Sequence, residues 1–310
     1  MNMRSTRRYP DPVLTEIAAY RSQRRGIRDA CAVLKLVLVT FAFGLLAWFA
    51  CRSSSAVVRI VMMIAAGFVL SGFLNLAHEC LHRSFVSGRG MNTIVGNLAA
   101  NVLFVNYTAY TDKHLKHHRC LATDEDTESA ARFQSLRRYM WTMSGVGFLV
   151  SNLLLNAYLI LGRMPSYLAK AQRRTQARGE ALRIAAWFLT IVTATGIWPP
   201  VLLTIYIGPL IIGYFWLMFF GLPEHYGCEP VRPRYLASRT TTSNRFVRFF
   251  MWNANFHTEH HRYPSAPAPL LARIGARPSV GMHRESSYLR WHWHVCRKLL
   301  QRREQEATHG

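Results

Sequence analysis

The sequence predicts an all-α integral membrane protein with about four transmembrane helices, further re-entrant or in-plane helices, and a cytoplasmic cap. Half of the 310 residues are hydrophobic, and they gather in long runs instead of spreading periodically. Arginines flank these runs, as they do in the cytoplasmic loops of membrane proteins. We therefore attribute the net charge of +22 to these flanks and to contact with anionic lipid, and not to binding of nucleic acid.

Four apolar runs are expected to cross the membrane, since about 20 helical residues span a hydrocarbon core about 30 Å thick. These runs are 31–51, 56–77, 183–198 and 201–221. The basic N-terminal segment 1–30 is expected to stay in the cytoplasm, and so is the basic connector 162–182. The last two runs would then form a hairpin that turns outside at Pro199 and Pro200. We treat the whole chain, 1–310, as one domain.

Two further apolar stretches, 92–110 and 139–161, are expected to be re-entrant or in-plane. A single crossing at either one would move a histidine cluster to the opposite side of the membrane from the others. A site shared by all the clusters forbids that arrangement. If one of these stretches crosses twice, the number of spans rises to six.

Residues 222–310 are expected to form the cytoplasmic cap and to end in an interfacial helix. Near the C-terminus an apolar stripe recurs at helical spacing, made of Leu289, Trp293, Cys296 and Leu300. This stripe would rest on the membrane surface or pack on the protein's own cap. Four histidines match no ligand spacing and are expected at the surface or at the membrane interface: His283, His292, His294 and His309.

Three clusters of histidine carry the chemical signal of the chain. The first has the spacing HxxxH, and the second and third have the spacing HxxHH; they are His78 and His82, then His114, His117 and His118, then His257, His260 and His261. Residues three and four apart share one face of a helix, so each cluster would aim its imidazoles at one point. Neutral imidazole is the commonest metal ligand, and eight imidazoles are too many for one ion. The six cysteines form no CxxC pair, so we predict a polynuclear site with nitrogen ligands only.

Acidic residues accompany each histidine cluster, although the chain has only 16 of them. We expect four to orient the ligands: Glu79, Asp126, Glu224 and Glu259. Metal-bound imidazoles usually donate their second N–H to a carboxylate, which fixes the tautomer of the ring. The alternative is that these are ordinary surface acids beside basic loops, and for the acidic residues of 124–128 the two interpretations are about equally weighted.

The clusters and their surroundings resemble those of the membrane-bound fatty acid desaturase and hydroxylase superfamily, integral membrane proteins with a histidine-box di-iron site. The resemblance covers residues from about 30 to 275. It extends to the Arg83 that follows the first cluster and to Trp252-Asn253 before the third. The segment Pro223-Glu224-His225-Tyr226-Gly227 is similar to the isolated histidine of membrane alkane hydroxylases.

This resemblance implies an O2-dependent oxidoreductase with two non-haem irons that removes hydrogen from a fatty acyl or other lipid chain. If a second hydrogen is removed, the product is an alkene and the enzyme is a desaturase. If oxygen rebound follows instead, the product is an alcohol and the enzyme is a hydroxylase or monooxygenase of an alkyl or acyl chain. The sequence does not decide between these outcomes. His225 is expected to be a ninth ligand, because it lies at the cytoplasmic end of the last span beside Glu224. The alternative for His225 is a position at the headgroup boundary.

Electrons must come from another protein. The sequence contains no GxGxxG for a flavin or nicotinamide, no rubredoxin-type CxxC pair and no recognisable haem domain. The resemblance therefore implies a separate ferredoxin-like or other small electron-transfer protein, which the basic cytoplasmic face would attract. We expect a multi-pass protein of the cell membrane with its active site on the cytoplasmic side.

Two other functions compete with this interpretation. His78-Glu79-Cys80-Leu81-His82 is a literal HExxH, the signature of zinc metalloproteases, and an intramembrane protease could carry it. That hypothesis leaves both HxxHH clusters unexplained. A haem-binding electron carrier would instead place single histidines within facing spans. The metal content and the absorption spectrum distinguish these alternatives.

Overall fold

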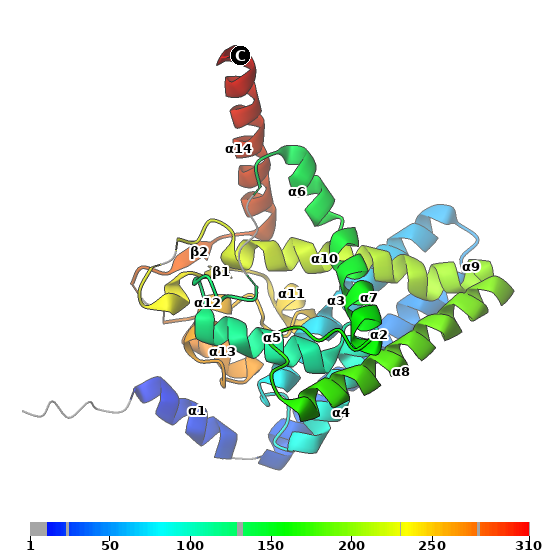
Figure 1. Cartoon of the computed structure of the whole chain (residues 1–310), viewed down its shortest axis with the longest axis horizontal. Coiled ribbons are helices and arrows are strands. Elements are labelled where there is room, and N and C mark those ends of the chain that lie inside the picture. The colour runs from blue at the N-terminus through cyan, green and yellow to red at the C-terminus, as the bar shows by residue number, and fades with distance from the viewer. Residues whose placement is uncertain (1–10, 23–24, 129–132, 230, 278–279, 310) are drawn as a thin grey trace, which may run out of the picture.

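The structure is a computed structural model that describes residues 11–22, 25–128, 133–229, 231–277 and 280–309. It is mostly helical, with one pair of short strands (Figure 1). The helices of the first half are α1 (Pro12–Ser22), α2 (Arg25–Arg52), α3 (Ala56–Leu81), α4 (Arg89–Asn101), α5 (Tyr107–Cys120), α6 (Leu136–Met143) and α7 (Val146–Ile160). The elements of the second half are α8 (Ala171–Ile197), α9 (Pro199–Leu202), the π-helix η1 (Leu203–Ile207), α10 (Gly208–His225), the 3-10 helix η2 (Arg234–Leu236), β1 (Arg239–Thr241), α11 (Arg245–Phe250), α12 (His257–Arg262), α13 (Ala268–Ile274), β2 (His283–Glu285) and α14 (Tyr288–His309).

Four helical segments are long and apolar enough to cross a membrane: α2, α3, α8 and the continuous segment Pro199–His225. A fifth candidate is the pair α6 and α7, which is bent by 57°. This confirms the predicted fold class and the expected number of about four spans. The stretch 139–161 falls within the bent pair. Figure 1 shows the spans reaching the α9 end of the molecule, whereas β1, β2, α12 and α13 gather at the other end.

Helix α8 begins at Ala171, well before the expected start of the span at 183. The connector 162–182 is therefore partly helical. Its residues Ala177, Glu180 and Ala181 are buried against the rest of the protein, which stabilises this part of the helix. The side chain of Glu180 is fully buried, and its two oxygens accept hydrogen bonds from the backbone N–H groups of Tyr107 (2.6 Å) and Thr108 (2.9 Å). Carboxylates stabilise the N-terminus of a helix, so α8 anchors the start of α5.

The stretch 92–110 contains all of α4 except its first turn, then a break, and the start of α5. In the break, Phe104 has φ of +56°, a left-handed conformation that is uncommon for a bulky residue. Asn106 caps α5, since its side-chain oxygen accepts from the N–H of Ala109 (3.0 Å) and its amide donates to the carbonyl of Ala177 (2.9 Å). The asparagines of this stretch thus set the direction of α5, the helix that carries the second histidine cluster.

A two-stranded parallel pair, β1 and β2, is the one strand pairing in the described part of the chain. Thr240 of β1 donates its hydroxyl proton to Glu259 of α12, and the same hydroxyl lies 3.3 Å from the N–H of Thr258. This contact holds α12 in place although the helix has only six residues. The strands therefore serve to position the third histidine cluster.

Helix α14 packs on the protein, but not through the predicted stripe. Leu289 and Trp293 are exposed, whereas Trp291, Val295 and Leu299 are buried in a cluster with Tyr139 and Met143 of α6. Figure 1 shows α14 projecting from the body with α6 beside it. Three residues of the predicted stripe, Leu289, Trp293 and Leu300, thus remain exposed, whereas the fourth, Cys296, packs against this cluster.

The placement of His292 at the surface or membrane interface was wrong. This residue is buried on α14; its Nε2 donates to the carbonyl of Phe219 (2.8 Å), and its Nδ1 lies 2.5 Å from the hydroxyl of Tyr139. The carbonyl can only accept, so Nδ1 accepts the proton of Tyr139. His292 links α14 to α6 and α10. The described side chain of His294 is exposed, as expected, and that of His309 lies outside the described residues.

Candidate metal centre

The histidine clusters lie at helix ends that converge on one point. His78 is in the last turn of α3, and His82 follows the end of that helix. The second cluster is on α5, the third is on α12, and His225 is the last residue of α10. Because each cluster has helical spacing, its imidazoles leave one face of the helix together. The result is a cluster of nine imidazoles from four parts of the chain.

Five of these imidazoles form a first group, made of His78, His82, His114, His118 and His260. One nitrogen from each of the five lies within 4.8 Å of all the others. The Nε2 atom of His114 is 2.9 Å from both His78 Nε2 and His118 Nε2, and His118 Nε2 is 3.0 Å from His260 Nε2. Imidazole nitrogens about 2.1 Å from a common ion, at right angles to each other, are about 3 Å apart. The spacing of this group suits one metal ion.

A second group contains His117, His225 and His261, whose ligand atoms also lie within 4.8 Å of one another. His257 joins them, since its Nε2 is 2.9 Å from His225 Nε2 and 3.0 Å from His261 Nε2. The nine predicted ligands thus lie in two groups, one of five imidazoles and one of four. The arrangement matches two adjacent metal ions.

The chemistry of the donors also fits metal binding. Burial, together with the imidazoles of His78 and His117, lowers the pKa of His118 to about 3, and burial lowers the pKa of His260 and His261 well below the usual value. The rings are therefore neutral, which is the form that coordinates metals. The buried Nε2 of His82 has no hydrogen-bond partner among the described residues, and a metal ion would satisfy it.

Three carboxylates lie beside the second ring nitrogen of a ligand. His117 Nδ1 donates to Asp126 Oδ1 (2.7 Å), and His114 Nδ1 donates to Glu128 Oε2 (3.0 Å). Glu224 Oε1 is 3.6 Å from His257 Nδ1. Burial opposes ionisation of Asp126, but the hydrogen bonds from His117 and from the backbone N–H of Glu128 outweigh it and lower the pKa of this carboxyl. His225 is oriented differently, since its Nδ1 donates to the carbonyl of Ala237 (3.0 Å).

The expected role of Glu79 and Glu259 in orienting histidines does not match the geometry. Glu79 accepts from Ser84 Oγ (3.0 Å) and from the N–H of Ala268 (3.0 Å), and Glu259 accepts from Thr240. Neighbours in a helix point to different faces, so an acid directly beside a histidine in the sequence, as Glu79 is beside His78 and Glu259 beside His260, is turned away from its ring. Glu79 thus links α3 to Ala268 of the cap, and Glu259 links α12 to β1 within the cap. Glu128 belongs to the acidic run 124–128 that follows the second cluster, and it contacts His114 although it was not among the four acids expected to orient the ligands.

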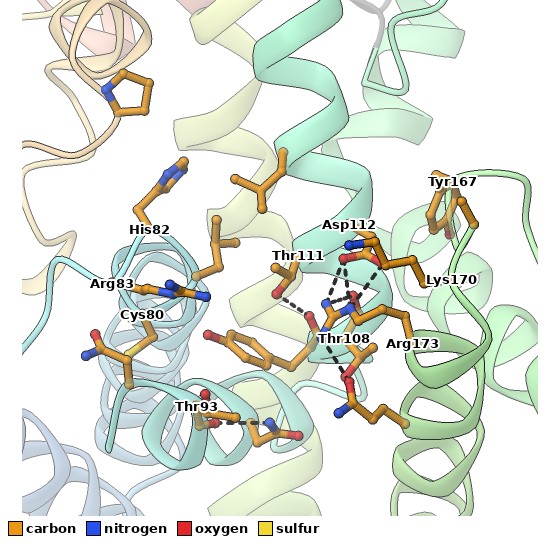
Figure 2. Close-up of a pocket in the computed structure, with 18 of the residues that line it drawn as sticks. Cys80, His82, Arg83, Thr93, Thr108, Thr111, Asp112, Tyr167, Lys170 and Arg173 are labelled. Carbon is orange, nitrogen blue, oxygen red and sulfur yellow. Dashed lines mark hydrogen bonds and ion pairs between the residues drawn. The ribbon is translucent and has the colours of Figure 1, made fainter. Parts of the chain in front are cut away.

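Two hollows adjoin the centre. The first, called the metal cavity here, has a volume of about 370 Å³ and is lined by histidines of both groups and by apolar side chains that include Leu74, Phe148, Leu217 and Met251. The second, called the basic groove, has a volume of about 950 Å³ and contains His82. Its cationic residues are Arg83, Arg119, Lys170, Arg173 and Arg183. Figure 2 shows His82 and Arg83 on one side of this groove and Lys170 and Arg173 on the other.

A sequence model described as "Fatty acid desaturase" matches residues 53–293, more than half of the chain and all nine histidines. The chain belongs to the fatty acid desaturase family. It is therefore an oxidoreductase of that family, a multi-pass membrane protein with a histidine-box site for two metals. The HExxH protease interpretation is excluded, and Glu79, its general base, is bonded to Ser84 and Ala268 instead of facing the imidazoles.

Several desaturases are similar to this family member. It is 25% identical over 304 residues to an "sn-2 acyl-lipid omega-3 desaturase (ferredoxin), chloroplastic" of Helianthus annuus, which covers 87% of this chain and 67% of the relative. It is 24% identical over 268 residues to an "sn-1 oleoyl-lipid 12-desaturase" of Anabaena variabilis, covering 76% and 72%. A shorter match to a "Delta(12) fatty acid desaturase" of Mortierella isabellina is 32% identical over 108 residues, 33% of this chain and 27% of the relative.

Proposed function

We propose that this protein introduces a double bond into a fatty acyl chain of a membrane lipid, with dioxygen, two non-haem irons and electrons from a separate carrier. The observation that carries the proposal is the metal cavity, in which apolar walls meet histidines of both metal groups. An acyl chain held there would lie against both metals. Relatives named as acyl-lipid and oleoyl-lipid desaturases support a lipid-linked substrate.

The donor set suits iron, because imidazole nitrogen is a good ligand for iron and the family typically holds two irons. When bound, the irons would supply dioxygen activation and the removal of hydrogen from an unactivated C–H bond. The nine imidazoles would hold both ions, with Asp126 and Glu128 fixing the rings of His117 and His114. The apolar walls would exclude water and hold methylene groups in place.

The overall reaction balances with a carrier that supplies two electrons. Two electrons and two protons leave the acyl chain, and two electrons from the carrier and two protons from water join them. Together they reduce dioxygen to two molecules of water. The carrier would be a separate protein, which the name of the ferredoxin-dependent relative supports.

We place the electron carrier at the basic groove. The groove and the metal cavity have no lining residue in common, so a carrier bound at the groove would leave the cavity free for the acyl chain. His82 lines the groove and is also a ligand of the first metal group, which offers a short path for electrons. Arg173 is bonded to Asp112 (2.9 Å), as Figure 2 shows, whereas Arg119 and Lys170 are exposed. An acidic ferredoxin-like protein would complement this charge.

We also propose that the centre faces the cytoplasm of a cell-membrane protein, because basic residues of segments 1–30 and 162–182 lie beside the first cluster. Arg21 donates to the carbonyl of Arg83 (3.1 Å), and Lys170 and Arg173 line the basic groove with His82. Ser54 and Ser166 are both exposed and lie in loops, so single cysteines placed there report the two sides. A membrane-impermeant thiol reagent should label Ser54→Cys in intact cells and Ser166→Cys only after lysis. The reverse pattern would refute the orientation.

The proposed reaction is tested by lipid analysis of cells that express the protein. We expect lipids with one additional double bond, and none when His117→Ala is expressed to the same level in the membrane. Alcohols in place of alkenes would establish the hydroxylase alternative, which the same metal centre could support. Unchanged lipids in cells that contain the iron-loaded protein and a competent carrier would contradict the proposal.

A further inference from the structure

An apolar groove opens on the surface formed by α2, α3, α10 and α11, at the start of α14. It has a volume of about 1040 Å³, and its walls include Leu45, Ala65, Phe68, Trp216 and Phe246. Several wall residues are exposed on membrane-spanning or adjacent helices, among them Leu45 and Phe246. We call this hollow the outer groove. Because its walls belong to three candidate membrane spans, α2, α3 and α10, the chains of bilayer lipids are the apolar molecules that surround it.

Two aromatic residues separate the outer groove from the metal cavity. Phe220 of α10 and Tyr288 of α14 line both hollows. Their ring centroids are 4.9 Å apart and the rings are nearly perpendicular, so they meet edge to face. Both side chains are buried. Behind them, on the metal side, lie Leu217 and Met251.

The rim of the outer groove also has a distinct chemistry. Its polar lining residues are neutral: Thr242, Ser243, Asn244, Ser286 and Ser287. Each of these side chains carries a hydrogen-bond donor, although that of Ser286 contacts Glu285 (3.2 Å), and the groove is lined by no charged residue in the described part of the chain. Such a rim suits the ester carbonyls of a bilayer lipid. A polyanionic carrier of the acyl group would call for cations instead.

We propose that the outer groove is a lateral portal through which the acyl chain of an esterified bilayer lipid reaches the metal cavity, with Phe220 and Tyr288 as its gate. This inference rests on the proposed function, and it adds the route and the class of substrate. The two rings touch, so a chain can pass only when one of them changes its side-chain rotamer. The neutral rim would hold the ester while the chain lies past the gate.

Phe220 also sets the geometry of the bound chain. It precedes His225 by five residues on α10, a distance of about 7.5 Å along the helix axis. A chain that passes Phe220 is therefore close to the second metal group. The carbons between the ester and the gate would remain in the outer groove.

The portal is tested with the full chain in nanodiscs of phosphatidylcholine that carries a photoreactive diazirine at the end of one acyl chain. Illumination and peptide mass spectrometry then show which segments the chain reaches. We expect labels in the metal cavity, at 217–226 and 251–257. Ala65→Trp, which fills the outer groove, should reduce these labels at least about tenfold, as loss of an access route would.

Leu189→Trp is the matched control, because Leu189 is exposed on α8 and lines neither hollow. It should leave the cavity labels unchanged, and both variants should retain the wild-type metal content as a measure of correct folding. Phe220→Ala should increase the labels. Cavity labels that persist in metal-loaded Ala65→Trp would overturn the portal.

Failure of the portal and failure of the proposed function give different results. Double bonds formed equally well by the wild type and by Ala65→Trp would overturn the portal and leave the desaturase function intact. Cavity labels that depend on Ala65, in a protein that forms no double bond, would support the portal and overturn the function.

Discussion

His225 Nε2 and His257 Nε2 lie 2.9 Å apart, although the two residues come from α10 and α12. One residue ends a membrane span, and the other begins the helix of the third histidine cluster. Their separation is that of two ligands of one ion. We therefore propose that His225 is a ligand of the second metal group, and not a polar residue at the headgroup boundary.

Substitution of His225 should selectively deplete the second metal group. In His225→Ala three imidazoles remain there while the first group keeps five, so we expect roughly half of the iron to be lost, together with the activity. Elemental analysis of the purified protein measures this. His294→Ala is the control, since His294 is exposed on α14. Full iron content in His225→Ala would show that His225 is not a ligand.

Two matched carboxylate-to-amide substitutions distinguish an acid that contacts a predicted ligand, Asp126, from one that contacts the cap, Glu79. Asp126→Asn weakens the contact to His117 and should lower metal affinity by about 10- to 100-fold. Glu79→Gln should leave metal affinity within a few-fold of the wild type, because Glu79 contacts Ser84 and Ala268. Metal affinity is measured by competition with a chelator. Equal losses in both variants would contradict the division.

These acids also show what sequence reasoning could and could not reach. The gathering of the imidazoles was predictable because helical spacing alone aligns His114, His117 and His118, whereas their role as ligands stays a prediction. Glu79 and Glu259 were misjudged because adjacency in sequence does not bring two helical side chains together. The contact of Glu180 with α5 joins residues more than 70 positions apart, so no local pattern could reveal it. The face of α14 that packs on the protein was likewise set by Tyr139 and Phe219, far away in the chain.

Glu180 should matter for stability although it lies outside the metal centre. Glu180→Ala leaves the buried N–H groups of Tyr107 and Thr108 without their acceptor, which should cost about 1–3 kcal/mol per group. Because α5 carries three ligands, metal retention on heating should fall as well. Thermal unfolding in detergent checks this. Asp124→Ala, at an exposed position, should have no comparable effect, and equal stability of the two variants would refute the anchoring role.

Charge reversal in the basic groove should impair electron delivery without harming the metal site. Lys170→Glu and Arg119→Glu should each slow turnover with a ferredoxin several-fold at low salt, and the difference should shrink as ionic strength rises. Reduction by a small neutral chemical reductant should be unaffected. Arg290→Glu, on the exposed side of α14, serves as the control. Equal sensitivity of both reductants to these changes would indicate damage to the centre instead.

The central claim is that the two groups of histidines hold two irons that desaturate an acyl chain. The most direct measurement supplies ¹⁸O-labelled dioxygen and a reduced ferredoxin to the iron-loaded protein in lipid nanodiscs, followed by mass spectrometry of the lipid and the water. We predict one new double bond in the acyl chain, with the label recovered in water and none in the lipid. Label in a lipid hydroxyl group, or no change in the lipid with two irons bound, would contradict the account.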